Sequence, residues 1–180
     1  MIRLAPQQKN SVPGLSRVTT AAMMTAIIFL FTFLIKLPTA VGYIHLGDAL
    51  LLLYAAATAD PIALLAGALG EGLADLAGGY APYIPATVLI KAAIALPVVF
   101  AAKRERREHP EPICRTRRIV LSTLPSVPIT LGGYFAVDYF LTRAYAFAAL
   151  GTNAIQAVAS ILLFLLLATA FDKSSFKRYL

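Results

Sequence analysis

Long uncharged stretches alternate with short polar segments along most of this chain. Val18 to Ile35 is a run of 18 uncharged residues, Ile119 to Val137 is a run of 19, and Ala144 to Phe171 is a run of 28. About 20 helical residues span the roughly 30 Å hydrocarbon core of a bilayer. The three runs therefore predict three transmembrane helices.

The stretch between the first two of these runs is less regular and predicts three shorter helices. Ala49 to Ala59 is uncharged and ends at an Asp60-Pro61 turn, and the Gly- and Pro-rich segment from Gly78 to Pro85 marks a second turn. Kinks are expected at Pro97, Pro125 and Pro128. The pattern predicts six helices, near residues 18–36, 47–60, 61–78, 85–102, 119–142 and 145–171.

Composition excludes a soluble globular protein. The 180 residues are 59% apolar and 14% charged, whereas soluble domains are about 45–50% apolar and about 25% charged. The single cysteine, Cys114, excludes a disulfide scaffold, and we interpret it as an incidental thiol because no His or Cys stands at a metal-ligand spacing from it. The sequence indicates an all-α membrane protein with one six-helix transmembrane domain, residues 18–172, between tails at 1–17 and 173–180.

The distribution of positive charge predicts how the helices are oriented. If the N-terminus is cytoplasmic, 13 of the 16 Lys and Arg residues fall in the cytoplasmic segments 1–17, 60–61, 103–118 and 172–180; the exceptions are Lys36, Lys91 and Arg143. Positive residues concentrate on the cytoplasmic side of membrane proteins. Both termini are therefore predicted to be cytoplasmic, and the net charge of +7 is assigned to topology and to a lipid surface rather than to nucleic acid.

Three ionisable residues fall within the predicted helices: Glu71, Asp75 and Lys91. Each costs about 2.5–3.5 kcal/mol at the bilayer centre, so we expect all three to face the interior of the bundle. Glu71 and Asp75 are four residues apart on one helical face, and Lys91 stands at the depth of Asp75 on the next helix. Two interpretations stay open: a salt bridge between the third and fourth helices, or one structural pair and an uncompensated carboxylate that awaits a ligand donor.

Polar residues of the last two helices share this depth, in the outer half of the membrane. They are Tyr134 and Asp138 on the fifth helix and Asn153 and Gln156 on the sixth. A single polar stripe more often joins helices to one another, but several stripes at one level favour a pocket that opens to the outside.

Two outer loops are in position to close such a pocket. They carry Tyr43, His45, Tyr80 and Tyr83, which are able to stack on a flat ring; alternatively, the tyrosines belong to the aromatic belt of the membrane interface and His45 is solvated. Asp48 is expected to cap the second helix and also to belong to the site. No metal site is expected.

Rows of small residues mark two helices. Ala66, Gly70 and Ala74 lie along one face of the third helix, and Ala22-x-x-x-Ala26 lies near the cytoplasmic end of the first. Such rows let helices approach closely, and packing within the chain is their default explanation.

Several motifs resemble a known family. They are Leu46-Gly47-Asp48, Ala74-Asp75-Leu76 with Gly79-Tyr80, Pro85-Ala86-Thr87 with Lys91, and Asn153 with Gln156. Together they resemble the S components of energy-coupling factor (ECF) transporters, in the branch that includes riboflavin-, pyridoxine- and hydroxymethylpyrimidine-type S components. The Ala22-x-x-x-Ala26 motif stands where the first helix of that family docks on its transmembrane partner. Glu71 departs from the family pattern and favours a basic or donor-rich ligand.

The resemblance implies a binding subunit, not an enzyme, in a bacterial or archaeal plasma membrane. It would capture a B vitamin or a precursor from outside, with a pyridoxine- or hydroxymethylpyrimidine-type heterocycle favoured, and would need no cofactor. Its implied partners are a transmembrane coupling (T) subunit and two ATPases, and the chain itself has no G-x-x-x-x-G-K-[ST] phosphate loop.

Two other classes of protein are alternatives. A stand-alone proton- or sodium-coupled carrier would use Glu71 and Asp75 for the coupling ion, but no inverted repeat is visible. An intramembrane enzyme would need a nucleophile and base beside the acidic pair, and the sequence shows no such set.

Overall fold

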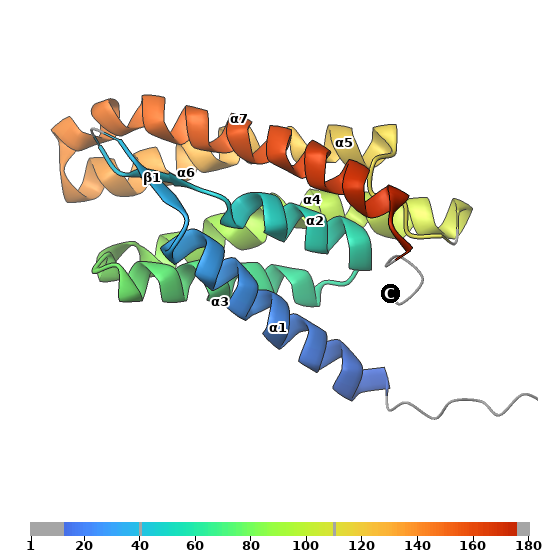
Figure 1. Ribbon diagram of the computed structural model, residues 1–180. Coiled ribbons are helices and arrows are strands. Elements are labelled where there is room, and N and C mark those ends of the chain that lie inside the picture. The colour runs from blue at the N-terminus through green and yellow to red at the C-terminus, as the bar shows by residue number, and fades with distance from the viewer. Residues whose placement is uncertain (1–12, 40, 110, 176–180) are drawn as a thin grey trace, which may run out of the picture.

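The computed structural model describes residues 13–39, 41–109 and 111–175. Within these residues the chain is a bundle of helices with one small hairpin (Figure 1). The elements in chain order are α1 (Pro13–Phe33), β1 (Lys36–Pro38), β2 (Tyr43–His45), α2 (Gly47–Thr58), α3 (Ile62–Ala77), the 3-10 helix η1 (Ala81–Tyr83), α4 (Ile84–Glu108), α5 (Arg117–Thr123), α6 (Ser126–Leu141) and α7 (Arg143–Lys173).

Helices α2 and α4 lie in the middle of the bundle, between the pair α1 and α3 and the pair α6 and α7 (Figure 1). Leu51 and Leu52 of α2 and Ile94 and Val98 of α4 are fully or almost fully buried between these pairs. Gly70 of α3 lets α1 approach, because a Cβ atom there would lie 2.8 Å from the carbonyl oxygen of Thr25. The predicted small-residue face of the third helix is thus used for packing within the chain.

Four of the described helical segments are long and apolar enough to cross a membrane: Gly14–Phe33, Ala81–Glu108, Arg117–Leu141 and Arg143–Lys173. Helices α2 and α3 are shorter, with 12 and 16 residues. At 1.5 Å per residue they are about 18 and 24 Å long. The structure thus confirms the prediction of an α-helical membrane protein.

Helix boundaries differ from the predicted ones where charge or proline intervenes. Helix α4 continues to Glu108, six residues beyond the predicted end, because a helix does not have to stop where the apolar span stops; Arg104 and Glu108 form an i,i+4 ion pair of 3.7 Å there. The predicted fifth helix is divided at Leu124 and Pro125 into α5 and α6. Helix α4 continues through Pro97.

The short antiparallel hairpin was not predicted. Lys36 pairs with His45, and Pro38 with Tyr43. Gly42 allows the tight reversal because its φ of +94° lies in a region that side chains disfavour. The hairpin carries the chain from α1 to α2 and brings Tyr43 and His45 over the bundle.

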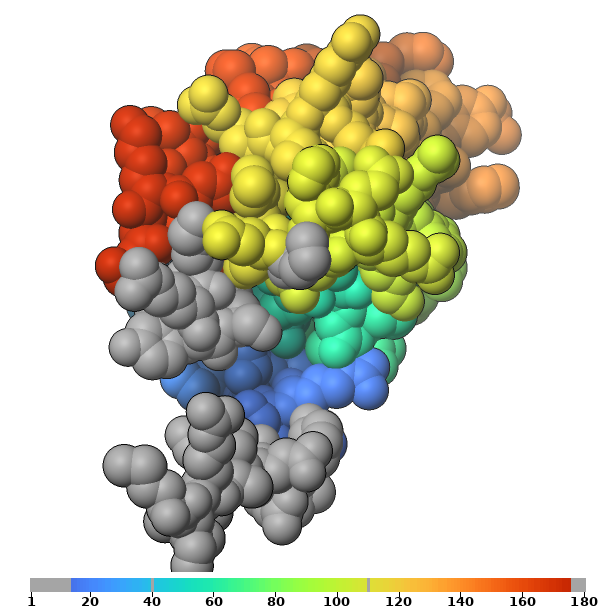
Figure 2. Space-filling view, turned by 90° about the vertical axis from the view of Figure 1, so that its right-hand side faces the viewer, coloured from blue at the N-terminus to red at the C-terminus, as the bar shows by residue number. Residues whose placement is uncertain are grey.

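Basic residues gather at one end of the molecule, where α4 ends, α5 begins and α7 ends; this end faces the viewer in Figure 2. The α2–α3 turn lies at this end as well, and Arg17 of α1 donates two hydrogen bonds to Asp60 of that turn, at 2.5 and 2.6 Å. Exposed basic residues in the segment 103–118 are Lys103, Arg104, Arg107, Arg115 and Arg117. Four positive residues of the predicted cytoplasmic tails lie outside the described residues: Arg3, Lys9, Lys177 and Arg178.

Candidate functional site

A cavity opens at the opposite end of the bundle from the basic segment. Its volume is about 100 Å³, and the empty space is about 710 Å³ when the open solvent at its mouth is counted. The hairpin, α1, α3, η1, α4, α6 and α7 all contribute to its wall. The lining residues are Thr32, Val41, Gly42, Tyr43, His45, Glu71, Asp75, Tyr80, Tyr83, Thr87, Lys91, Tyr134, Asp138, Tyr145, Ala149, Thr152, Asn153 and Gln156.

A buried ion cluster forms the floor of the cavity. The ammonium group of Lys91 on α4 lies 2.6 Å from Asp48 Oδ1 on α2 and 3.0 Å from Glu71 Oε2 on α3. All three side chains are at most 2% exposed. Two carboxylates therefore share one cation, and three helices are tied together at one point.

Gln156 of α7 links this cluster to the hairpin. Its amide oxygen accepts a hydrogen bond from the backbone N–H of His45 at 2.8 Å, and its amide nitrogen donates to the His45 carbonyl at 3.1 Å. The same nitrogen lies 3.0 Å from Asp48 Oδ2. One side chain thus fixes the position of the hairpin over the cavity.

Asp75 and Asp138 have hydroxyl partners rather than cationic ones. Thr87 donates to Asp75 at 2.5 Å, and the Tyr43 hydroxyl lies 3.5 Å from the other oxygen of that carboxylate. Tyr83 donates to Asp138 at 2.7 Å. Neither carboxylate forms an ion pair with a described Lys or Arg.

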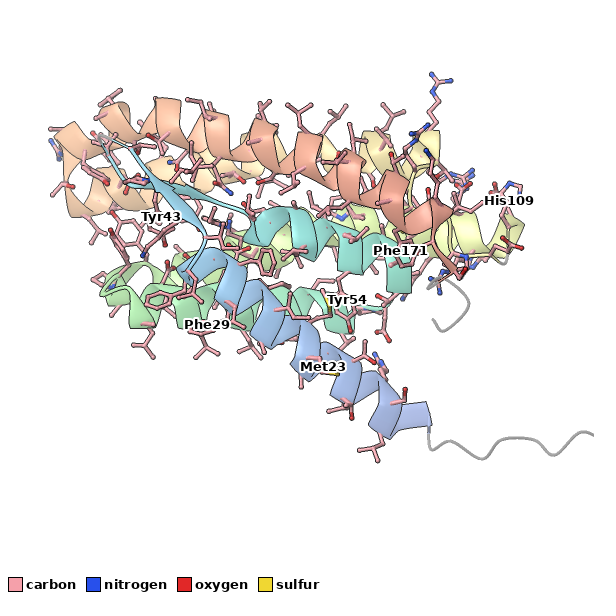
Figure 3. The ribbon with its side chains drawn as sticks, viewed as in Figure 1. Met23, Phe29, Tyr43, Tyr54, His109 and Phe171 are labelled. Atoms are coloured by element: carbon pink, nitrogen blue, oxygen red, sulfur yellow. The ribbon has the colours of Figure 1, made fainter. Side chains whose placement is uncertain are left out.

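Aromatic rings surround the mouth. Tyr43 points from the hairpin toward α3 (Figure 3), and its ring centre lies 5.7 Å from that of Tyr80 and 5.8 Å from that of His45. Tyr80 is 6.3 Å from Tyr83, in an edge-to-face arrangement. Rings arranged in this way offer both faces and edges to a flat ligand.

Burial changes the acid–base behaviour of the hairpin residues. Burial lowers the pKa of His45 to about 4, so its imidazole is neutral near pH 7. Burial and the nearby Asp75 carboxylate raise the pKa of the Tyr43 hydroxyl. Both groups therefore take part in hydrogen bonding at neutral pH without carrying charge.

One group of donors has the residue types of a metal site. Ligand atoms of His45, Asp48 and Glu71 lie within 4.8 Å of one another. The ammonium group of Lys91, however, already lies against both carboxylates. A metal ion at this point would repel that ammonium group, so the donor set fits the lysine better than a metal.

The structure brings together the residues that the sequence singled out, with one exception. Eleven of the twelve predicted site residues line the cavity; Asp48 lies beneath its floor, against Lys91 and Gln156. Asp48 is also not the N-cap of the second helix: that position is Leu46, without a side-chain capping bond. The carboxylate is instead turned inward by its ion pair.

The sequence left open which acid pairs with Lys91. The salt bridge between the third and fourth helices exists, but its acid is Glu71 and not Asp75. Asp75 lies one turn further along α3, where Thr87 and Tyr43 are its partners. The carboxylate without a cation is therefore Asp75.

Several wall residues were not predicted as site residues. Thr87 stands in the motif that contains Lys91, and its hydroxyl lies between Asp75 and Tyr134. Thr32, Tyr145 and Thr152 also line the cavity. The motif that contains Lys91 was a signal for Thr87, whereas the other single hydroxyls give no periodic signal in apolar helices.

Three residues predicted for other roles lie away from the cavity. Ala22 and Ala26 are exposed on the outer face of α1. Cys114 is buried, and burial raises the pKa of its thiol to about 12. A thiol in this state is unreactive, consistent with an incidental cysteine.

Comparison with known proteins gives one family match. A sequence model of the family described as "ECF-type riboflavin transporter, S component" matches residues 14–173. No curated protein is significantly similar to the chain. The matched residues include the whole wall of the cavity and nearly all of the helical bundle.

Proposed function

Because the chain belongs to the family of ECF-type riboflavin transporter S components, and is thus a substrate-binding subunit of a vitamin transporter rather than an enzyme, we propose that its cavity captures a pyridoxine- or hydroxymethylpyrimidine-type heterocycle from outside the cell. The observation that carries this proposal is the wall of the cavity. It combines tyrosine rings with buried acids, amides and hydroxyls, as a flat, hydrogen-bonding ligand requires. Riboflavin, which the description of the family names, is the second probe.

The proposal includes a membrane arrangement. All six predicted spans cross the bilayer, α5 and α6 together counting as one, and both termini lie in the cytoplasm. The separation of the basic segment from the cavity supports this orientation, since positive residues favour the cytoplasmic side. In this arrangement the hairpin lies beyond the outer end of the short helix α2 and extends the path of that span across the bilayer.

The proposal also includes partners. A T subunit would dock on the exposed Ala22 and Ala26 of α1, and two ATPases would supply the energy. These roles rest on the family and on the exposure of the two alanines.

Direct titration tests the binding proposal. The purified chain, in lipid nanodiscs, is titrated by calorimetry with 4-amino-5-hydroxymethyl-2-methylpyrimidine, pyridoxine and riboflavin. We expect one of them to bind with a Kd in the micromolar range or below, about −8 kcal/mol or better. Failure of all three to bind would contradict the proposal.

Uptake in cells distinguishes this function from a stand-alone carrier. We expect uptake to stop when the ATPase genes are deleted and to continue in the presence of an uncoupler when ATP is held constant. The opposite result would indicate ion-coupled transport.

A further inference from the structure

Two buried polar atoms in the wall of the cavity have no hydrogen-bond partner among the described residues. They are Thr32 Oγ1 of α1 and Glu71 Oε1 of α3. Thr32 is 2% exposed and Glu71 is 1% exposed. Leaving a buried polar group without a hydrogen bond costs about 1–3 kcal/mol of stability. Two such groups in one cavity indicate that a molecule in the cavity supplies the missing hydrogen bonds.

Both atoms border the same small space beside Gly47. A Cβ atom added to Gly47 would contact Thr32 Oγ1 and would lie 3.2 Å from Glu71 Oε1 and 3.2 Å from His45 Nδ1. The absence of a side chain at Gly47 therefore lets the Thr32 hydroxyl pack against the backbone at this point. Three polar atoms, from α1, α3 and the hairpin, surround it.

The chemistry of these atoms favours a donor. A carboxylate oxygen only accepts hydrogen bonds, and a threonine hydroxyl either accepts or donates. His45 Nδ1 already accepts from the Gly47 N–H at 3.2 Å. An amino group beside these atoms has two N–H bonds and would donate to Glu71 and Thr32 together, whereas a hydroxyl group has a single O–H bond to donate.

The charge of the wall disfavours an anion. Lys91 is the one Lys or Arg among the described wall residues, and it is already paired with Asp48 and Glu71. Asp75 and Asp138 add two carboxylates without a described cationic partner. A phosphate or carboxylate on the ligand would meet repulsion and no free cation.

We propose that Thr32 and Glu71 form a ligand subsite that binds an N–H donor, and that the ligand is a nitrogen heterocycle that carries such a donor and no negative charge. This inference rests on the proposed function and narrows it. Among the ligands proposed above, the subsite favours the aminopyrimidine over pyridoxine and over any phosphorylated vitamin.

Thr32→Val tests the subsite. Valine keeps the shape of threonine and removes a hydroxyl that bonds to no described residue, so the fold loses no hydrogen bond. We expect the affinity for 4-amino-5-hydroxymethyl-2-methylpyrimidine, measured by calorimetry, to fall about tenfold, and the melting temperature without ligand to be equal or higher. Ser126→Ala is the matched control, since Ser126 Oγ is also buried and unpartnered but lies outside the cavity wall; it should bind as the native chain does.

Changes in the ligand test the donor. Replacing the 4-amino group of the pyrimidine by methyl should weaken binding to the native chain about tenfold and should remove the difference between the native chain and Thr32→Val. The phosphate ester of the pyrimidine should not bind. If the native chain binds riboflavin instead, an analogue without the ring N–H replaces the methyl pyrimidine, and riboflavin 5′-phosphate replaces the pyrimidine phosphate ester.

The outcomes separate this inference from the function on which it rests. If no probe binds the native chain, the proposed function fails and the subsite fails with it. If a probe binds the native chain and Thr32→Val equally well, the function stands and the subsite is wrong. Tighter binding of a phosphate ester, or of pyridoxine, than of the N–H donors would likewise overturn the ligand class.

Discussion

Lys91 is a buried cation held between acids that belong to two other helices. Removing charges from water costs several kcal/mol per ion, and only close partners with good geometry offset this. Asp48 and Glu71 provide such partners at 2.6 and 3.0 Å. Lys91 therefore links three helices of the fold and is also a wall residue of the candidate site.

Replacing Lys91 by methionine should destabilise the protein strongly. Methionine keeps the bulk but leaves two buried carboxylates without a cation, and breaking a buried pair typically costs about 3–5 kcal/mol. The melting temperature of the detergent-purified protein should fall accordingly, and Lys91→Ala should lower it at least as much.

The charge-balanced triple variant is the control for this prediction. Lys91→Met combined with Asp48→Asn and Glu71→Gln removes all three charges together, so much of the lost stability should return. Ligand titration then separates the roles of the cluster: if Lys91→Met and Lys91→Ala both bind the cognate ligand normally, the cluster is not part of the site.

His45 should make stability depend on pH in a defined range. Burial lowers the pKa of His45 from 6.5 to about 4, so between these values the unfolded chain binds more protons than the folded chain. Stability therefore rises with pH in this range: the contribution of His45 is fully present above pH 6.5 and is lost as the pH falls toward 4. Thermal unfolding between pH 7.5 and 4 measures this loss.

His45→Asn is the comparison for this measurement. Asparagine offers an oxygen in place of Nδ1 for the Gly47 N–H and has no titratable group in this range. The difference in melting temperature between the native chain and His45→Asn should therefore change between pH 6.5 and 4. A constant difference would show that His45 does not titrate as a buried group.

At the level of elements, the hairpin and α7 form one unit around Gln156. The two strands have three residues each, too few to be stable alone. The paired hydrogen bonds between the His45 backbone and Gln156 compensate, and Thr39 lies 3.2 Å from Thr152 between the same elements. The outer wall of the cavity therefore depends on contacts between segments more than 100 residues apart.

Helix α1 packs on α3 with one face and leaves Ala22 and Ala26 exposed on another. Replacing both by leucine should leave ligand affinity unchanged and should impair assembly with the T subunit, because added bulk prevents close helix approach. Co-purification with the T subunit and the ATPases measures assembly.

Helix α7 offers a matched pair for this experiment. Ala144 and Ala148 are also exposed and also four residues apart, so changing both to leucine adds the same bulk on another helix. This control should assemble normally. Intact assembly of the Ala22/Ala26 variant would exclude docking through this face of α1.

The whole molecule separates a polar cavity at one end from a basic surface at the other. The cavity lies against acids of α3 and α6, whereas the exposed basic residues lie at and beyond the end of α4. Such a separation suits a protein that binds its ligand on one side of a membrane and faces anionic lipid on the other.

Thiol labelling tests this orientation. A cysteine at Leu37, which is 69% exposed in the hairpin, should react with a membrane-impermeant maleimide on intact cells. A cysteine at the exposed Arg107 should react only after permeabilisation. The native chain serves as background, since burial raises the pKa of Cys114 to about 12 and keeps it unreactive. Labelling of both positions from the same side would contradict the six-span arrangement.

The sequence alone indicated an α-helical membrane protein, its helical segments (the fifth of which the structure divides into α5 and α6) and eleven residues that line the cavity. The run lengths, the cost of charge in a membrane and the placement of Lys and Arg depend on residue type and position, so they can be read without a structure. For the same reason Glu71, Asp75 and Lys91 were correctly expected inside the bundle.

The tertiary structure decided which of these residues meet. Depth along a helix does not fix the rotation of that helix about its axis or the choice of its neighbour, so Lys91 pairs with Glu71 and Asp48 and not with Asp75. Thr32 belongs to the cavity only because α1, α3 and the hairpin converge beside Gly47. Pairing and convergence depend on packing between segments distant in sequence, and no local pattern encodes them.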